Sequence, residues 1–121
     1  MGKELNLLAK YPVTNRNLQA RRNEKSFEVR NIARQFDREF FDGDRKYGYG
    51  GLTYHPKYLA GVAQDINTLY GPLDSSSLLD VGCARGFMLY DILRLFPNAE
   101  VAGIDISEYA IATSHPEIAI K

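Results

Sequence analysis

The fold is decided by the stretch Ser77-Leu78-Leu79-Asp80-Val81-Gly82-Cys83-Ala84-Arg85-Gly86. Its first five residues are a short, largely apolar run between a serine cluster and a glycine, which is typical of a strand buried on both faces of a parallel sheet. The residues from Gly82 to Gly86 predict a turn, because glycine adopts backbone conformations that other residues avoid. A strand followed by a glycine-bearing turn is the first part of a nucleoside-binding unit.

The residues after this turn continue the same unit. Residues 87–95 carry apolar side chains at helical spacing, and Pro97-Asn98 predicts the end of that helix. Residues 100–106 predict a second strand, and Ser107 is placed to cap a further helix that runs to about Ser114. Residues 77–113 therefore predict an α/β fold of the Rossmann-like kind, in which helices flank a parallel sheet.

Two glycine patterns compete for the turn. The dinucleotide pattern G-x-G-x-x-G, begun at Gly82, requires glycines where the sequence has Ala84 and Phe87. The second pattern is an acidic residue, any residue, and then Gly-x-Gly-x-Gly. It is met by Asp80, Gly82 and Gly86, with alanine at the middle glycine position. We favour the second pattern and keep a nicotinamide-dinucleotide protein as a weaker alternative.

With Asp105 at the end of the second strand, the chain resembles class I S-adenosylmethionine-dependent methyltransferases over roughly residues 76–113. The resemblance implies that Gly82 and Gly86 let the backbone pass beneath the methionine portion of the cofactor, with Asp80 facing its amino group. It also implies that Asp105 binds the ribose and that Ile106 packs against the adenine. The implied S-adenosylmethionine-binding residues are Asp80, Gly82, Cys83, Ala84, Arg85, Gly86, Asp105 and Ile106.

Ala84 is the departure from the commonest pattern of that family. A positive φ at an alanine costs about 1 kcal/mol or more, because its Cβ crowds the backbone. We therefore expect strain at this position, and a cofactor that sits slightly displaced.

The other reactive side chains favour structural explanations. Cys83 has no identifiable base beside it, so we interpret it as a small packed residue and not a nucleophile. His55 and His115 each precede a proline at an expected element boundary. One cysteine and two distant histidines do not predict a metal site. No catalytic residue can be assigned from the sequence.

Three parts of the chain are expected. Residues 1–25 form a basic N-terminal arm, either loose or with a short helix, and residues 73–121 form the first half of the methyltransferase domain. Residues 26–72 form a helical extension between them. In this extension Ser26 begins one helix over about 26–42, with a left-handed exit at Gly43, and a second helix runs from Pro56 to Gly71-Pro72.

The segment 47–54 predicts a loop rich in glycine and tyrosine. Tyrosines between flexible glycines could form a lid over the cofactor or line the acceptor pocket, and the candidates are Tyr47, Tyr49 and Tyr54. A surface turn whose rings pack on the preceding helix explains the same residues equally well. Both interpretations stay open.

The charge of the chain is balanced overall but not along its length. Residues 1–35 hold eight basic and three acidic residues, a net charge of +5, whereas the rest carries −5. The basic part could contact an anionic partner, although a solvated arm explains it without any function, and we favour the arm. The balanced total does not indicate a nucleic-acid partner.

Three sequence features bear on where in the cell the protein is found. No segment approaches the roughly 20 apolar residues that cross a membrane, and the amino terminus has no signal-peptide core. The single cysteine fits a reducing compartment. We therefore expect a cytoplasmic protein without membrane contact.

The resemblance implies further strands and acceptor-binding residues after the second strand, and the sequence ends soon after it. We favour a fragment over a truncated gene product or a half-domain completed by another chain. A two-stranded sheet has an unpaired edge, through which copies could self-associate.

The expected function is methyl transfer to an unidentified small-molecule acceptor, with little activity in the isolated chain. The alternative is a non-catalytic cofactor-binding or assembly module.

Overall fold

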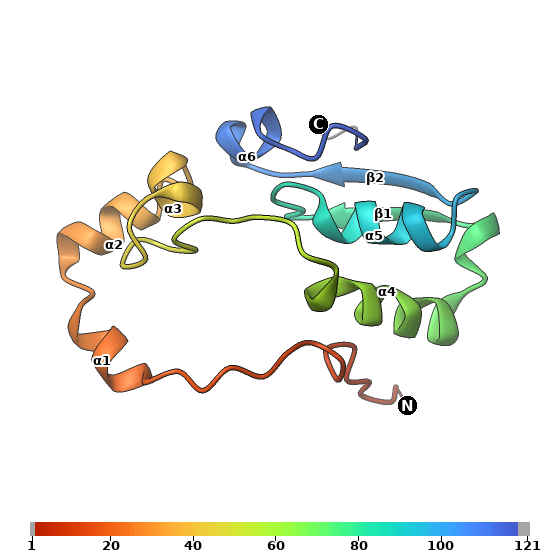
Figure 1. Cartoon of the computed structure of the whole chain (residues 1–121), viewed down its shortest axis with the longest axis horizontal. Coiled ribbons are helices and arrows are strands. Elements are labelled where there is room, and N and C mark those ends of the chain that lie inside the picture. The colour runs from red at the N-terminus through yellow and green to blue at the C-terminus, as the bar shows by residue number, and fades with distance from the viewer. Residues whose placement is uncertain (1, 119–121) are drawn as a thin grey trace.

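The computed structural model describes residues 2–118 and forms an α/β arrangement (Figure 1). Three short helices gather at one end of the molecule, and a two-stranded sheet with its covering helices forms the other end. The elements are α1 (Leu18–Asn23), α2 (Phe27–Ala33), α3 (Arg38–Asp42), α4 (Pro56–Tyr70), η1 (Leu73–Ser75), β1 (Ser77–Val81), α5 (Phe87–Leu95), β2 (Glu100–Ile104) and α6 (Glu108–Ala112). None of the helices within residues 2–118 is long and apolar enough to cross a membrane.

The strand-helix-strand unit has the predicted form. β1 and β2 pair in parallel, with Ser77 opposite Glu100 and Val81 opposite Ile104, and α5 connects them. β2 is two residues shorter than predicted, because the chain turns after Ile104 to place Asp105 against the loop that follows β1. The α/β class and the parallel pairing are therefore confirmed.

α6 begins where the sequence predicts. The Ser107 hydroxyl accepts a hydrogen bond from the Ala110 amide at 3.0 Å, so Ser107 is the expected N-cap. The helix ends at Ala112, two residues before the predicted end.

Only one face of the sheet is covered within the described residues. α4 and α5 pack on the face that carries Leu78 and Val101, where a buried apolar cluster forms from Ala63, Leu73, Ile92 and Ala99. On the other face Leu79 is 60% exposed and Val81 is 71% exposed. The prediction that β1 is buried on both faces is wrong for this part of the chain, because both packed helices lie on the same side.

α4 is the long helix predicted from Pro56. Proline occupies its first turn, where no amide donor is needed, and the helix ends at Tyr70 before Gly71-Pro72. The imidazole of His55 caps it, with Nδ1 accepting a hydrogen bond from the Lys57 amide at 3.2 Å. Val62 and Ala63 are its buried residues.

The single helix predicted over 26–42 is wrong. Ser26 does begin a helix, since its hydroxyl accepts from the Val29 amide at 3.2 Å, but that helix ends at Ala33. Phe36 has a left-handed φ of 49°, and Asp37 then caps α3 through its bond from the Arg38 amide at 2.7 Å. The break has a tertiary cause, because the Phe36 carbonyl accepts a hydrogen bond from the Ser107 hydroxyl.

The end of α3 and the following loop agree better with prediction. α3 ends at Asp42, although Gly43 leaves with a φ of −78° and not by a left-handed exit. The segment 47–54 contains no helix or strand, as predicted, and lies against α3. Its Tyr49 amide donates to the Phe40 carbonyl at 2.9 Å. A side chain at Gly48 would clash with that same carbonyl, so glycine permits the close approach.

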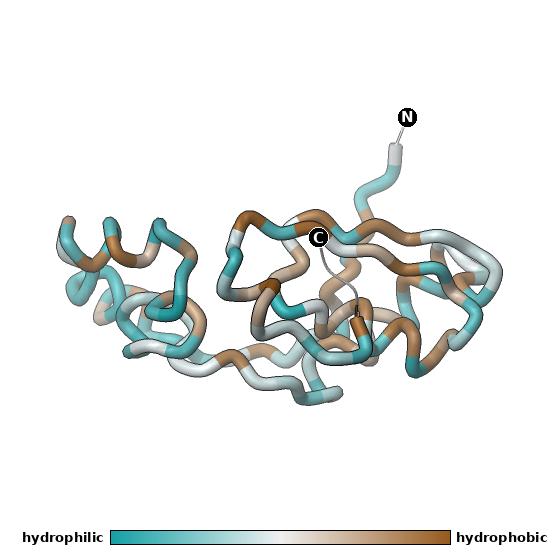
Figure 2. The backbone as a smooth tube through the Cα atoms, turned by 90° about the horizontal axis from the view of Figure 1, so that it is seen from above, coloured by the Kyte–Doolittle hydropathy of each residue, from teal (hydrophilic) through white to brown (hydrophobic). Residues whose placement is uncertain are grey.

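The two ends of the molecule differ in composition. Figure 2 shows hydrophobic stretches running through the sheet and its helices, whereas the part that holds α1 to α3 is mostly hydrophilic. Helices α1 and α2 bury no residue, and α3 buries only Phe41. The apolar core of the molecule therefore lies between the sheet, α4 and α5.

Candidate functional site

The turn Gly82–Gly86 after β1 has an unusual backbone. Gly82, Ala84 and Gly86 all have positive φ, at 81°, 50° and 75°. Glycine adopts this conformation freely, but alanine does not, so the strain expected at Ala84 is present. The turn stays in this shape because the Ala84 amide donates a hydrogen bond to the Asp105 carboxylate at 2.7 Å.

Asp105 lies behind the turn, at the carboxyl end of β2. One carboxylate oxygen accepts from the Ala84 amide at 2.7 Å, and the other accepts from the Ser107 amide at 2.8 Å. Each oxygen of a carboxylate can accept more than one hydrogen bond. Asp105 can therefore hold the turn and still accept hydrogen bonds from a ligand hydroxyl.

A cavity of about 670 Å³ opens in front of the turn. Its lining comes from the N-terminal part, the loop after α3, α4, β1, the turn and α5, and comprises Tyr11, Arg16, Arg21, Phe40, Arg45, Gly48, Tyr49, Gly51, Leu52, Thr53, His55, Tyr58, Leu59, Asp80, Gly82, Cys83, Ala84, Arg85, Phe87, Met88 and Asp91. A Cβ added at Gly82 would meet no atom within 4 Å, so the backbone here faces open space. This volume lies within the range of small-molecule and cofactor sites.

Most of the predicted cofactor-binding residues meet at this cavity. Asp80, Gly82, Cys83, Ala84 and Arg85 line it, whereas Gly86, Asp105 and Ile106 do not. Gly86 is buried at the start of α5, and Ile106 is 85% exposed beyond β2. The predicted residues of β1 and of most of its turn thus line one cavity, whereas Asp105 and Ile106, which follow β2, lie outside the lining.

Asp80 places a carboxylate in the cavity wall. Burial raises the pKa of this half-buried group, and the negative charge of Asp105 raises it further. Within residues 2–118 no hydrogen bond to its side chain is formed. A carboxylate in this position is complementary to a cationic ligand group, which would offset both effects.

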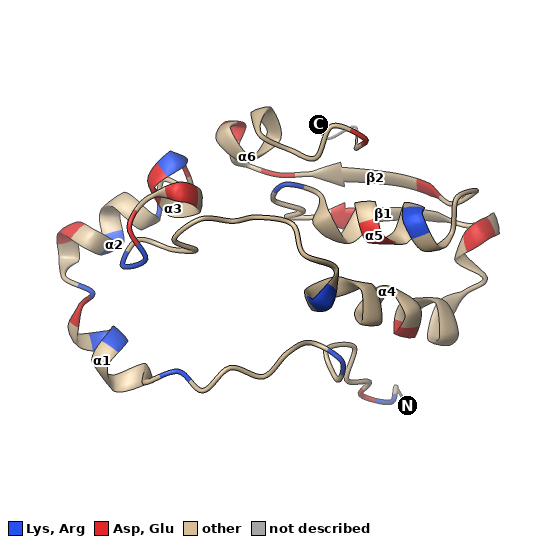
Figure 3. Ribbon diagram, viewed as in Figure 1, with Lys and Arg blue, Asp and Glu red and all other residues tan. Residues whose placement is uncertain are grey.

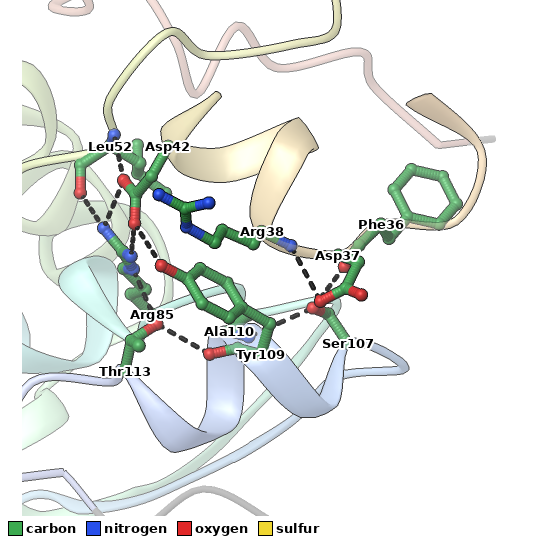
Figure 4. Close-up of polar contacts among 10 residues, drawn as sticks. All are labelled: Phe36, Asp37, Arg38, Asp42, Leu52, Arg85, Ser107, Tyr109, Ala110 and Thr113. Carbon is green, nitrogen blue, oxygen red and sulfur yellow. Dashed lines mark hydrogen bonds and ion pairs between the residues drawn. The ribbon is translucent and has the colours of Figure 1, made fainter. Parts of the chain in front are cut away.

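Arg85 has a structural partner that the sequence did not reveal (Figure 4). Its guanidinium is buried, pairs with the Asp42 carboxylate and donates to the Leu52 carbonyl, while its Nε donates to the Thr113 hydroxyl at 3.0 Å. The Tyr109 hydroxyl donates to Asp42 at 2.7 Å. The hydrogen bond from Arg85, followed by that from Tyr109, lowers the pKa of Asp42. Arg85 therefore joins the turn to α3 and α6.

Cys83 is buried, and burial raises the pKa of its thiol to about 11, with Asp80 and Asp105 raising it in the same direction. A thiol in this state is a poor nucleophile, which agrees with a packed cysteine.

His115 stacks on Tyr90 with ring centroids 3.7 Å apart. No group of side chains able to hold a metal ion occurs within residues 2–118.

The three tyrosines of the loop lie in different surroundings. Tyr49 lines the cavity and stacks on Phe41 with ring centroids 5.8 Å apart. Tyr54 does not line it; its hydroxyl donates to Asp91 at 2.5 Å and accepts from Arg94 at 3.0 Å. Tyr47 is also outside the lining. A role as a lid stays a prediction, and Tyr49 is the member of the set best placed for it.

Several lining residues were missed by the sequence analysis. Arg16, Arg21 and Arg45 reach the cavity from the N-terminal part and from the loop after α3, and His55 and Asp91 reach it from α4 and α5. The excess of basic residues in 1–35 was the one signal for two of them. Their convergence depends on tertiary structure, which residue spacing does not encode.

Comparison with known proteins agrees with this geometry. No curated protein and no solved structure matches the chain significantly. Residues 73–118 match the family model described as a methyltransferase domain, and this segment contains β1, the turn, α5, β2, Asp105 and α6. The resemblance to methyltransferases is therefore confirmed over residues 73–118, which we call the methyltransferase segment after this similarity.

Proposed function

We propose that the cavity is the S-adenosylmethionine site of a class I methyltransferase that acts on a small-molecule acceptor. One observation carries the proposal: Asp80 and the left-handed turn meet at a single cavity, with Asp105 bonded to the back of that turn. These are the residues that the family resemblance assigns to the cofactor.

The residues present fit the charge and shape of that cofactor. The Asp80 carboxylate suits its ammonium group, since a nearby cation offsets the burial and repulsion that raise the pKa of Asp80. Gly82 leaves space for close approach, and Asp105 retains acceptor capacity for ribose hydroxyls. Ile106 is 85% exposed and therefore accessible to an adenine ring.

Bound at this site, S-adenosylmethionine supplies an electrophilic methyl group on a sulfonium. The contribution of the chain is alignment, because holding two reactants in one geometry removes much of the barrier to a bimolecular step. The cavity volume of about 670 Å³ is in the range of small-molecule sites, which favours a small acceptor. Among the described lining residues, His55 is not a ready base, since its Nδ1 already accepts the Lys57 amide.

The test is a calorimetric titration of the 121-residue chain with S-adenosylhomocysteine and, separately, with the nicotinamide dinucleotide NAD. We expect saturable binding of S-adenosylhomocysteine alone, and a loss of at least about tenfold in affinity for Asp105→Ala, the scale of one hydrogen bond to a charged group. Asp74→Ala is the matched control, because Asp74 also accepts a backbone amide, from Asn98 at 2.9 Å, but forms no bond to the turn that lines the cavity.

Two outcomes would reject the proposal. Saturable binding of NAD in preference to S-adenosylhomocysteine would restore the dinucleotide alternative. Equal affinities of the wild type and the folded Asp105→Ala variant would mean that the ligand binds elsewhere.

A second candidate, a non-catalytic cofactor-binding or assembly module, is favoured by the open face of the sheet. Leu79, Val81 and Ile104 are 60%, 71% and 42% exposed there, and contiguous apolar surface of this kind favours association. Sedimentation velocity tests this candidate. A concentration-dependent dimer that Val81→Lys dissociates would support it, and a monomer at all concentrations would count against it.

A further inference from the structure

Three of the arginines that line the cavity come from the N-terminal part of the chain, outside the methyltransferase segment. Arg16 lies just before α1, Arg21 lies within α1, and Arg45 lies in the loop after α3. Figure 3 shows basic residues along the N-terminal segment, on α1 and beside α3. Segments that share no regular hydrogen bonding with the sheet thus supply positive charge to the same cavity.

These arginines lack acidic partners among the described residues. The ion pairs found within residues 2–118 join Lys10 to Asp65, Arg38 to Glu39 and Arg85 to Asp42. Arg45 donates one N–H to the Gly48 carbonyl, which fixes the guanidinium on its loop and leaves further donors for a ligand. The three arginines that line the cavity therefore form no ion pair within the described residues.

The three charges also act on one another. Burial lowers the pKa of Arg45, and the positive charges of Arg21 and Arg16 lower it further. Like charges held near one another in a partly enclosed space repel, and an anion bound among them relieves that repulsion.

The cavity is divided by charge. The methyltransferase segment contributes the carboxylates of Asp80 and Asp91, and the N-terminal part contributes the three arginines. The proposed cofactor meets the carboxylate of Asp80 with its cationic end. The arginines are then available for a second ligand of opposite charge.

We propose that Arg16, Arg21 and Arg45 bind a phosphate group of the methyl acceptor. This inference rests on the function proposed above. Phosphate is favoured over a carboxylate because it carries up to two charges and more acceptor oxygens, and planar guanidiniums bind it through paired N–H donors. A cavity of about 670 Å³ favours a phosphorylated metabolite over a nucleic acid, which needs an extended basic surface.

The test is a titration of the 121-residue chain with inorganic pyrophosphate at fixed ionic strength, with and without saturating S-adenosylhomocysteine. We expect saturable binding that weakens about ten- to hundredfold in Arg21→Ala and in Arg45→Ala, the scale of a lost charge-assisted hydrogen bond. Arg22→Ala is the matched control, since Arg22 lies next to Arg21 on α1 but outside the cavity lining. Arg45→Lys retains charge without the fork and should bind with intermediate affinity.

The same variants distinguish the acceptor from the cofactor's own carboxylate. We expect S-adenosylhomocysteine affinity to be unchanged in Arg21→Ala. If that affinity falls while 5′-methylthioadenosine, which lacks the carboxylate, binds normally, the arginines serve the cofactor and the inference is wrong. Because pyrophosphate is titrated alone first, failure here is separate from failure of the cofactor site.

Three further results would overturn the inference. Equal loss of pyrophosphate affinity in Arg22→Ala would indicate non-specific attraction to a basic segment. Acetate binding as tightly as pyrophosphate would indicate a carboxylate ligand. Single-stranded RNA binding with a similar loss in all the arginine variants would indicate an extended nucleic-acid surface. If Arg45→Ala fails to fold, the pyrophosphate affinity of Arg16→Ala is measured in its place, and an unchanged affinity would overturn the inference.

Discussion

The two walls of the cavity are held in place by different forces. The methyltransferase segment, residues 73–118, packs through apolar clusters, in which Leu89 and Ile92 are completely buried. The N-terminal region, residues 2–55, buries one aromatic side chain from its helices, Phe41. Its α3 end is joined to the segment by polar contacts from Arg85 to Asp42 and from Ser107 to Phe36, and by the packing of Phe41 near Tyr109.

The two walls should therefore differ in stability, and with it in the part each plays in binding. A wall built on an apolar core has the full stability of the fold, whereas a wall attached by few contacts opens at lower free energy. The proposed cofactor residues Asp80 and Gly82 lie on the first wall, and Arg16, Arg21 and Tyr49 lie on the second. Rigid cofactor binding and adjustable acceptor binding would follow from this arrangement.

The largest effect should come from the apolar wall. Ile92→Ala removes a completely buried side chain from the cluster between α4, α5 and the sheet, and should cost about 2–5 kcal/mol of unfolding free energy. Leu18→Ala on α1, where the leucine is 71% exposed, should cost less than about 0.5 kcal/mol. Urea denaturation followed by circular dichroism measures both. Similar losses in the two variants would abolish the distinction between the walls.

The next effect should come from the bond between the walls. Asp42→Ala leaves the buried Arg85 guanidinium without its carboxylate, and we expect a loss of about 1–3 kcal/mol, reduced by the partial exposure of Asp42. Limited proteolysis should also cleave the N-terminal region faster in this variant. Asp44→Ala removes an exposed carboxylate that bonds only the Lys46 amide of its own loop, so it should cost less stability and leave the rate of proteolysis unchanged.

Acid should act on the same bond. The pKa of Asp42 is lowered in the folded state, so its stabilisation is present above the unfolded value near 3.9 and is lost as the pH falls through the folded pKa. The stability difference between the wild type and Asp42→Ala should therefore narrow below about pH 4. A difference that stays constant through that range would mean that charge is not what joins the walls.

How far the sequence predicts this molecule depends on the range of the interactions. β1, the turn, α5 and β2 follow from local signals, namely apolar runs, glycines and a Pro-Asn stop, and all of them are found. The helix expected over 26–42 failed because its apolar spacing continues through Phe36, whereas the chain breaks there to bond Ser107, distant in sequence. Periodicity within one segment does not report such a bond.

The site was predicted to the same extent and for the same reason. Asp80, Gly82 and Ala84 belong to one short motif, so their meeting at the cavity could be predicted. Arg45 lies in a loop and reaches the cavity only because that loop packs on α3. The basic excess of the N-terminal part was visible, but it did not indicate that Arg21 lines a cavity and Arg22 does not.

A smaller effect should appear at the strained turn. Ala84→Gly removes the Cβ from a residue with a φ of 50° and should stabilise the protein by about 0.5–1 kcal/mol, after allowance for the greater freedom of glycine in the unfolded chain. Ala112→Gly, at the end of α6, should have the opposite sign, since glycine is a poor helix former. Thermal unfolding of both variants measures this pair. A loss of stability in Ala84→Gly would mean that alanine is not strained there.

The smallest effect on stability should come from the Asp80 carboxylate. The folded pKa of Asp80 is raised, so its favourable contribution is complete below the unfolded value near 3.9 and is lost as the pH rises through the folded pKa. Asp80→Asn should therefore be more stable than the wild type at pH 7, by about 0.5 kcal/mol, and the gain should vanish in acid. Asp74→Asn is the control with the opposite sign, because hydrogen bonds from Asn98 lower the pKa of Asp74.

Bound ligand should reverse the order of stability of the wild type and Asp80→Asn. If Asp80 faces the cationic end of the cofactor, saturating S-adenosylhomocysteine will raise the melting temperature of the wild type more than that of Asp80→Asn, because binding to the native state stabilises it in proportion to affinity. Equal shifts would place the carboxylate outside the ligand's reach. A larger rise in the melting temperature of the wild type would mean that the half-buried Asp80 charge, which destabilises the free protein, stabilises the bound state by pairing with the ligand.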